Sequence, residues 1–157
     1  MQPVISTLRV AGYSLLVAMT KVLVFGTFDG LHEGHLDLLS QAKKHGDNLI
    51  VVVARDSTVL KNKGKAPKFK EQERLAKVQE NKLVAEAVLG TENHDTHQDS
   101  YDIIKEINPD IVCLGYDQAQ FAEKLKGELV RMGLDKAQIV ILRPFHPEKY
   151  KSSIMNK

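Results

Sequence analysis

The sequence of 157 residues contains a single cysteine, which cannot form a disulfide within the chain. This excludes the small secreted domains that disulfides hold together, and it suits a reducing compartment. The chain also lacks a large excess of charge of either sign, because 22 lysines and arginines nearly balance 20 aspartates and glutamates and leave a formal net charge of +2. So small an excess does not indicate bulk binding to nucleic acid, and any electropositive function must lie in a local patch.

Long apolar runs are lacking as well. The segment Val10–Met19 resembles the core of a signal peptide but is too short to span a bilayer. We interpret residues 1–20 as a non-essential extension, poorly ordered unless it packs on the domain at 21–157, and a signal peptide stays open as the alternative. The sequence thus predicts no association with a membrane.

What the chain does contain is an alternation of strand-like and helix-like segments. Apolar and β-branched runs predict buried strands at 22–26, 48–54, 86–89, 111–114 and 138–142. Amphipathic spacing predicts helices from about 33, and at 71–81, 100–107 and 118–132. This order predicts a single α/β domain with a Rossmann-like, doubly wound, five-stranded parallel sheet and helices on both faces. Ligands of such a sheet bind beyond the carboxyl ends of its strands.

The most informative segment is Val22–His35, where an apolar strand ends at Gly26 and a histidine pair opens the following helix. His32 and His35 fall in the first turn of that helix. Free backbone N–H groups and the positive end of the helix dipole favour an anion there, and imidazole donors add neutralising contacts. Glycine at position 34 leaves room for phosphates, so the segment predicts a site for a nucleoside triphosphate.

The ungapped pattern Gly-Thr-Phe-Asp-x-x-His-x-Gly-His resembles the signature of the cytidylyltransferase-like, or HIGH-motif, nucleotidyltransferases. Further matching segments lie at Ala54–Val59, Glu71–Arg74, Glu86–Gly90 and Pro109–Gln118. These segments are similar to those of archaeal-type FAD synthases, which are FMN adenylyltransferases close in sequence to glycerol-3-phosphate cytidylyltransferase. The resemblance implies a fold of the HUP nucleotidylyltransferase type and, as is common in this family, a possible homodimer.

The resemblance also implies roles for individual residues. The expected catalytic residues are His32, His35 and Lys43. The residues expected to contact the nucleotide are Gly26, Thr27, Phe28, His32, Gly34, His35, Gly115, Tyr116, Asp117, Ser152 and Ser153. Lys63 and Arg74 are expected to contact substrate phosphate, and no metal ligand from the protein is assigned.

The stretch Lys61–Lys70 holds five lysines in ten positions and is interpreted as mobile and basic. It is either a solvated loop or a lid whose lysines approach phosphate, while the lack of an interleaved aromatic array disfavours nucleic acid. Cys113 lies in a buried-strand pattern and is interpreted as a small core residue. His94 and His97 lie in a polar connection and are interpreted as part of a solvated loop rather than a metal site.

These observations together predict a cytoplasmic nucleotidyltransferase that releases pyrophosphate and uses ATP or CTP with Mg²⁺. FMN adenylyltransferase is the leading hypothesis, with FMN as the phosphorylated acceptor. A cytidylyltransferase acting on glycerol 3-phosphate or a related compound is the alternative enzyme. A nucleotide-binding module without turnover and a nucleic-acid binder that uses the basic stretch remain the alternatives from other classes.

Overall fold

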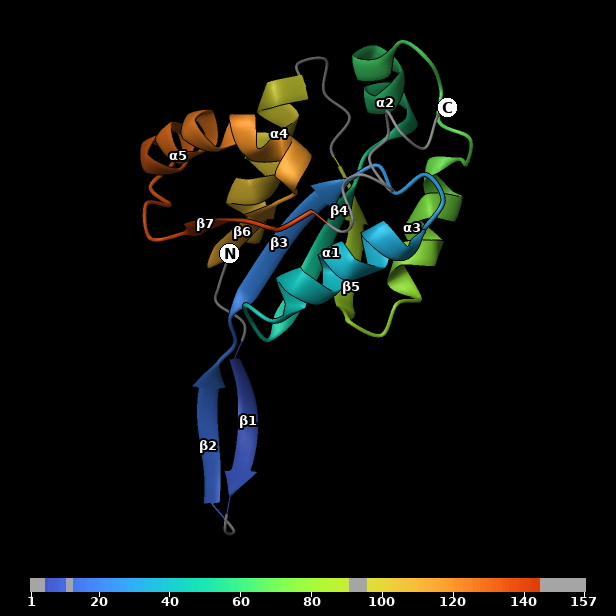
Figure 1. Ribbon diagram of the computed structural model, residues 1–157. Helices are drawn as coiled ribbons and strands as arrows, with labels where there is room; N and C mark the ends of the chain where they lie inside the picture. The colour runs from blue at the N-terminus through green and yellow to red at the C-terminus, as the bar shows by residue number, and fades with distance from the viewer. Residues whose placement is uncertain (1–4, 11–12, 91–95, 145–157) are drawn as a thin grey trace.

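The computed structural model describes residues 5–10, 13–90 and 96–144. At the amino end, β1 (Ile5–Val10) and β2 (Tyr13–Ala18) pair in an antiparallel hairpin. The hairpin lies outside the main sheet and extends away from it in Figure 1. The function of residues 1–20 as a non-essential extension stays a prediction.

The main sheet has five strands, all parallel, in the order β5-β4-β3-β6-β7. Their bounds are Lys21–Gly26 for β3, Asn48–Val53 for β4, Val84–Leu89 for β5, Ile111–Leu114 for β6 and Gln138–Ile141 for β7. Along the chain, β4 and β5 are added on one side of β3, and β6 and β7 are then added on its other side. This confirms the doubly wound parallel sheet and places its switch point between β3 and β6.

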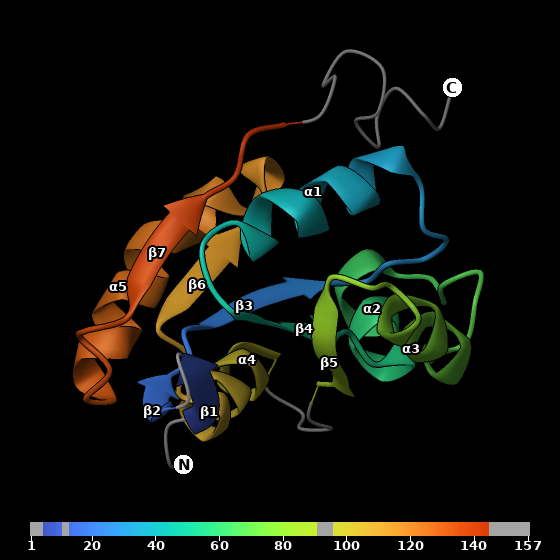
Figure 2. The same cartoon turned by 90° about the horizontal axis from the view of Figure 1, so that it is seen from below.

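Helices cover both faces of the sheet (Figure 2), namely α1 (Glu33–Lys43), α2 (Asp56–Lys63), α3 (Glu71–Gln79), α4 (Thr96–Ile107) and α5 (Ala122–Arg131). Val22 and Val24 of β3 pack under α1 and α3, whereas Leu23 packs under α4 and α5. Because successive side chains of a strand point to opposite faces, two covered faces require an unbroken apolar run. Within the described residues, no helix has the length and apolar character needed to cross a bilayer.

The segment after β4 differs from the prediction. Residues 56–63, interpreted from the sequence as the approach to a mobile basic stretch, form α2, and Gly64 ends that helix in the left-handed conformation at φ 76°. Only Val59 of this helix is buried, so its sequence shows little of the periodicity that reveals an amphipathic helix. In addition, the helix predicted at 118–132 begins as the 3-10 turn Tyr116–Phe121 before α5.

Tyr101 on α4 offers a test of the packing between the sheet and its second helical layer. Its ring stacks on Phe121 with a centroid distance of 6.1 Å, but its buried hydroxyl has no hydrogen-bond partner among the described residues. We expect Tyr101→Phe to leave the free energy of unfolding unchanged or to raise it by up to about 1 kcal/mol, because it removes a buried hydroxyl whose desolvation no hydrogen bond offsets. Urea unfolding measures this change. A loss of stability as large as that of Tyr101→Leu, which also removes the ring, would contradict it.

Candidate active site

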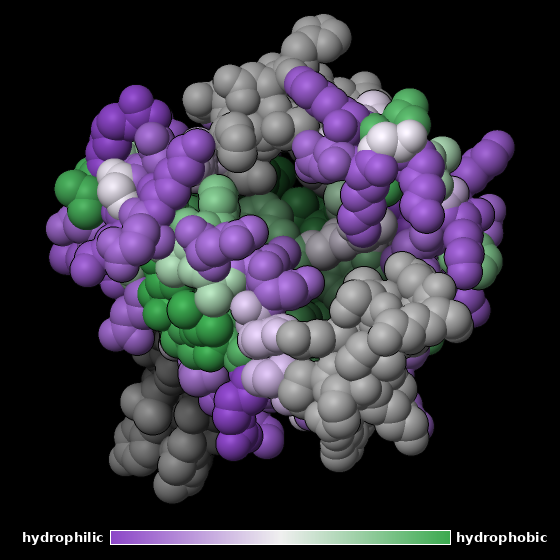
Figure 3. All heavy atoms as spheres, turned by 45° about the horizontal axis from the view of Figure 1, so that its top comes forward, coloured by the Kyte–Doolittle hydropathy of each residue, from purple (hydrophilic) through white to green (hydrophobic). Residues whose placement is uncertain are grey.

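The carboxyl ends of the parallel strands meet at one edge of the sheet, the upper end of β3 and β4 in Figure 1. This edge carries the loop 27–32 after β3, the start of α2 after β4 and the turn Tyr116–Phe121 after β6. Figure 3 shows a hollow on this side of the molecule, with a partly apolar floor and hydrophilic side chains around it. The strand order reverses between β3 and β6, which is where a doubly wound sheet binds its ligand.

The two histidines are organised by the start of α1. His32 is the N-cap, and its Nδ1 accepts hydrogen bonds from the backbone N–H groups of Gly34 at 3.0 Å and His35 at 3.4 Å. Nδ1 of His35 accepts in turn from the His32 N–H at 3.4 Å, and the two rings stack with centroids 3.9 Å apart. Because both Nδ1 atoms are acceptors, each Nε2 carries a proton. The pair therefore presents two N–H donors beside a helix N-terminus.

Burial keeps both imidazoles uncharged. The pKa of His35 is lowered from 6.5 to about 4, mainly by burial. Electrostatic repulsion of the protonated ring by His32 and Lys63 also lowers this pKa, whereas the Gly30 backbone and Asp117 raise it. Burial also lowers the pKa of His32. At neutral pH the histidines are therefore neutral hydrogen-bond donors rather than imidazolium ions.

The depressed pKa of His35 predicts a pH dependence of stability. The unfolded chain takes up this proton near pH 6.5 and the folded chain only near pH 4, so the free energy of unfolding falls as the pH drops through this range. In His35→Gln this part of the pH dependence is absent. Urea unfolding of both proteins at several pH values between about 4 and 7 measures the difference, and equal slopes would contradict the expectation.

Two other predicted residues lie near the histidines. Lys63 at the end of α2 and Asp117 in the turn after β6 lie close enough to influence the pKa of His35. Gly115 precedes that turn, and its N–H donates to Oε1 of Gln118 at 2.9 Å, while Tyr116 is exposed at the surface. Contacts of these residues with a nucleotide stay predictions.

Lys43 is not brought to the site. It lies in the last turn of α1, and its Nζ donates to the carbonyl oxygen of Gly46 at 3.3 Å. At ~1.5 Å per residue, the eight positions between His35 and Lys43 separate their backbones by ~12 Å along the helix. The side chain contacts the segment just past the carboxyl end of α1, and the catalytic role of Lys43 stays a prediction that this placement does not support.

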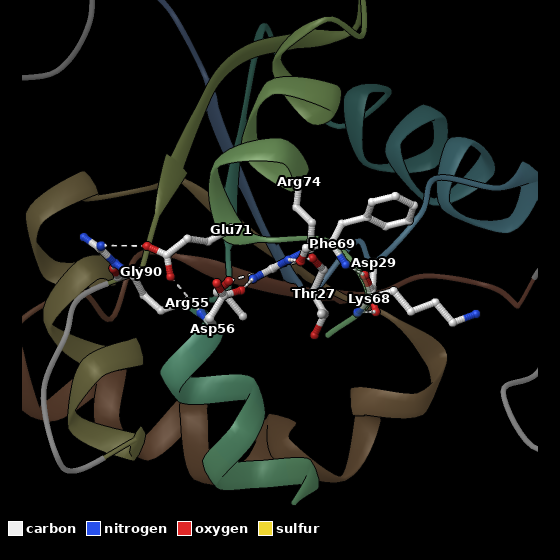
Figure 4. Close-up of polar contacts among 10 residues, drawn as sticks. Thr27, Asp29, Arg55, Asp56, Lys68, Phe69, Glu71, Arg74 and Gly90 are labelled. Atoms are coloured by element: carbon white, nitrogen blue, oxygen red, sulfur yellow. Dashed lines mark hydrogen bonds and ion pairs between the residues drawn. The ribbon is translucent and has the colours of Figure 1, made fainter. Parts of the chain in front are cut away.

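Arg74 is placed differently from the expectation as well. Its side chain is fully buried, and its guanidinium donates to the carbonyl oxygens of Thr27, Ala54 and Phe69 at 2.7 to 3.0 Å (Figure 4). A fourth bond, 2.7 Å long, joins it to Oδ1 of Asp56. The planar fork that the sequence assigned to substrate phosphate instead ties together the loops after β3 and β4.

Carboxylates extend this network to further loops, a feature that sequence reasoning missed. Asp29 accepts the backbone N–H groups of Lys68 at 2.7 Å and Phe69 at 2.9 Å. Glu71 accepts the backbone N–H of Asp56 at 2.8 Å and pairs with Arg55 at 3.1 Å (Figure 4). The acidic and basic residues of this region were visible in the sequence, but the same composition is typical of exposed helices.

The remaining predicted features are two serines, two histidines and the cysteine. Ser152 and Ser153 lie outside the described residues, as does His94. The prediction that His97 lies in a loop is wrong, because it belongs to α4, although its side chain is not described. Cys113 is buried in the core, and burial raises the pKa of its thiol to about 11, which keeps it protonated and unreactive. The prediction of a core cysteine is confirmed.

Comparisons with known proteins identify the family of this chain. A family model described as cytidylyltransferase-like matches residues 23–156. An FAD synthase of Thermoplasma volcanium is 40% identical over 139 residues, which span 88% of this chain and 93% of that protein. An FAD synthase of Methanosarcina mazei is 47% identical over 116 residues, 74% of this chain and 72% of that protein.

A solved structure shares the fold over nearly the same region. It is described as a lipopolysaccharide core biosynthesis protein from Thermoplasma volcanium and superimposes with a TM-score of 0.72 at 41% sequence identity. The match covers 82% of this chain and 99% of that chain. The family match spans both the histidine pair and the strands that position it. The chain belongs to the cytidylyltransferase-like family and is a nucleotidyltransferase.

Proposed function

We propose that this protein is an FMN adenylyltransferase, which transfers AMP from ATP to FMN and releases pyrophosphate. The observation that carries the proposal is the pair of histidines at the start of α1, whose Nδ1 atoms both accept backbone N–H groups, so that in the neutral rings each Nε2 carries the proton. The FAD synthases that are 40% and 47% identical to this chain support FMN as acceptor and ATP as donor. Glycerol-3-phosphate cytidylyltransferase, the alternative drawn from the sequence, is not favoured by these relatives.

The proposed reaction is an in-line displacement at the α-phosphorus of ATP. A phosphate oxygen of FMN forms the new bond to that phosphorus, and the bond to the bridging oxygen of the β-phosphate breaks, so pyrophosphate leaves with the electron pair. The FMN phosphate is already ionised, so no nucleophile or general base from the protein is needed. The task of the protein is to align the two phosphates and to stabilise the charge that develops on their oxygens.

His32 and His35 carry out the second task in this proposal. Their Nε2–H groups donate to phosphate oxygens in the transition state, and they are held in place by the cap and by mutual stacking. Lys63 at the end of α2, whose charge acts on His35, adds positive charge. Preorganised donors of this kind stabilise developing charge without reorganisation during the reaction.

A divalent cation such as Mg²⁺ fits this site as an ion held mainly by the substrates. When bound, it supplies neutralisation of charge on the triphosphate. The described residues include no group of three or more histidine, cysteine, aspartate or glutamate side chains that could hold a metal. Asp117 is the acidic side chain near His35, and water and phosphate oxygens, which Mg²⁺ commonly retains as ligands, would complete the coordination.

The test is pyrophosphate release by the purified protein with Mg²⁺, with ATP or CTP crossed against FMN or glycerol 3-phosphate. Activity confined to ATP and FMN, with FAD identified chromatographically, supports the proposal. Activity confined to CTP and glycerol 3-phosphate contradicts it and supports the alternative enzyme. Nucleotide binding without turnover in all four mixtures also contradicts it. Homodimerisation, a cytoplasmic location and the absence of nucleic-acid binding stay predictions.

Lys63 and Lys43 form a matched pair for testing which lysine serves the phosphates. We expect Lys63→Ala to raise KM for ATP or FMN about 10-fold or more, the scale of one charge-assisted hydrogen bond. Lys43→Ala is expected to leave kcat and KM unchanged, because Lys43 bonds to Gly46 at the far end of α1. Steady-state kinetics of both variants measure this, and a larger defect in Lys43→Ala would restore its catalytic role.

A further inference from the structure

Phe28 has a backbone conformation that its residue type rarely adopts. Its φ is +53°, in the left-handed region, and its side chain is only 4% exposed. Most residues other than glycine and asparagine are disfavoured in the left-handed region, so Phe28 keeps this conformation only because its surroundings hold it in place. Such strained residues concentrate at functional sites, and Phe28 lies four positions before His32.

The ring of Phe28 is held between the end of β3 and a histidine. A Cβ atom added to Gly26 would lie 2.6 Å from Cε2 and 2.8 Å from Cζ of the ring, so only glycine leaves the ring its place. On its other side the ring meets the imidazole of His35, with centroids 5.4 Å apart and planes inclined at 59°. The left-handed turn therefore directs an aromatic ring from the strand towards the histidine pair.

His35 is thereby enclosed by two rings. Its imidazole stacks on His32 with centroids 3.9 Å apart and meets Phe28 as its second ring contact. We propose that Phe28 is a positioning residue whose ring fixes the His35 imidazole against His32. The kinetic consequences of this proposal rest on the proposed function. The placement of the His35 ring by Phe28 does not depend on it.

The apolar ring has a second effect on His35. Burial is the largest cause of the low pKa of His35, and Phe28 is an apolar group in direct contact with it. The titratable groups that act on His35 are His32 at the start of α1 and Lys63 on α2, which lower its pKa, and Asp117 in the turn after β6, which raises it. Removing the ring admits water and is expected to raise the pKa of His35 towards 6.5.

The experiment compares Phe28→Ala, Phe28→Leu and Gly26→Ala with the unaltered protein by titrating the histidine signals in NMR spectra. Phe28→Ala is expected to raise the pKa of His35 by about 1 pH unit or more, and Phe28→Leu by less because leucine keeps apolar cover. Gly26→Ala leaves Phe28 in the chain but displaces its ring, so it is expected to act in the same direction. Phe69→Ala is the control, because its ring packs over Gly30 rather than in the space between Gly26 and His35.

The kinetic readout separates positioning from substrate binding. In Phe28→Ala, kcat is expected to fall about 10- to 100-fold with KM for ATP nearly unchanged, since a misplaced donor acts mainly in the transition state. An unchanged pKa of His35 in both Phe28→Leu and Gly26→Ala would overturn the inference. The titration needs no turnover, so a protein inactive with every substrate would refute the proposed function while the NMR result still decides the role of Phe28.

Discussion

His35→Ala is expected to lower kcat about 10²- to 10³-fold while the protein stays folded. This is the cost, about 2.7–4 kcal/mol, of removing one preorganised donor from a developing negative charge. Because the contact is made mainly in the transition state, kcat and kcat/KM should fall together. Steady-state pyrophosphate release, with circular dichroism to verify folding, measures the effect.

His35→Gln provides the matched control, since its side-chain amide retains an N–H donor but cannot titrate. Partial recovery of kcat relative to His35→Ala is expected. His32→Ala should lose activity to a similar degree and some stability as well, because it also removes the cap that accepts the Gly34 and His35 N–H groups. Turnover of His35→Ala close to that of the unaltered protein would refute the role of the histidine pair.

Arg74→Met is expected to lower the free energy of unfolding by about 3–5 kcal/mol and to abolish most activity. The substitution keeps an apolar stem of similar length but leaves three backbone carbonyl oxygens and Asp56 without their donor. The loops after β3 and β4 would then lose their common anchor. Urea unfolding measures the stability loss, and pyrophosphate release measures the loss of activity.

Two variants give this prediction its controls. Arg74→Lys keeps the charge but cannot reach four acceptors with one ammonium group, so it should remain strongly destabilised. Arg131→Met removes an exposed arginine that pairs with Glu128 on α5, and should change stability by no more than about 0.5 kcal/mol. An Arg74→Met protein of normal stability with a raised KM would instead support the phosphate contact that the sequence predicts.

Most of the sheet could be predicted because both of its faces are covered. Strands such as β3 and β4 then carry unbroken apolar runs, at 22–25 and 49–53, which can be recognised without knowledge of their neighbours. The helix α2 could not be predicted, since with Val59 as its buried residue it carries almost no pattern. The distance of Lys43 from the histidines could have been anticipated from helix geometry alone, because eight residues separate it from His35 by ~12 Å along α1.

The sequence by itself determined the five strands of the main sheet, the helices between them other than α2, and the histidine pair at the start of α1, because periodicity and motif spacing are local properties. Only the tertiary structure decided what Arg74 and Phe28 do. The partners of Arg74 come from three separate segments, and in our proposal Phe28 acts through a ring contact that depends on its left-handed backbone. Such roles depend on which segments meet in space, and spacing along the chain does not record that.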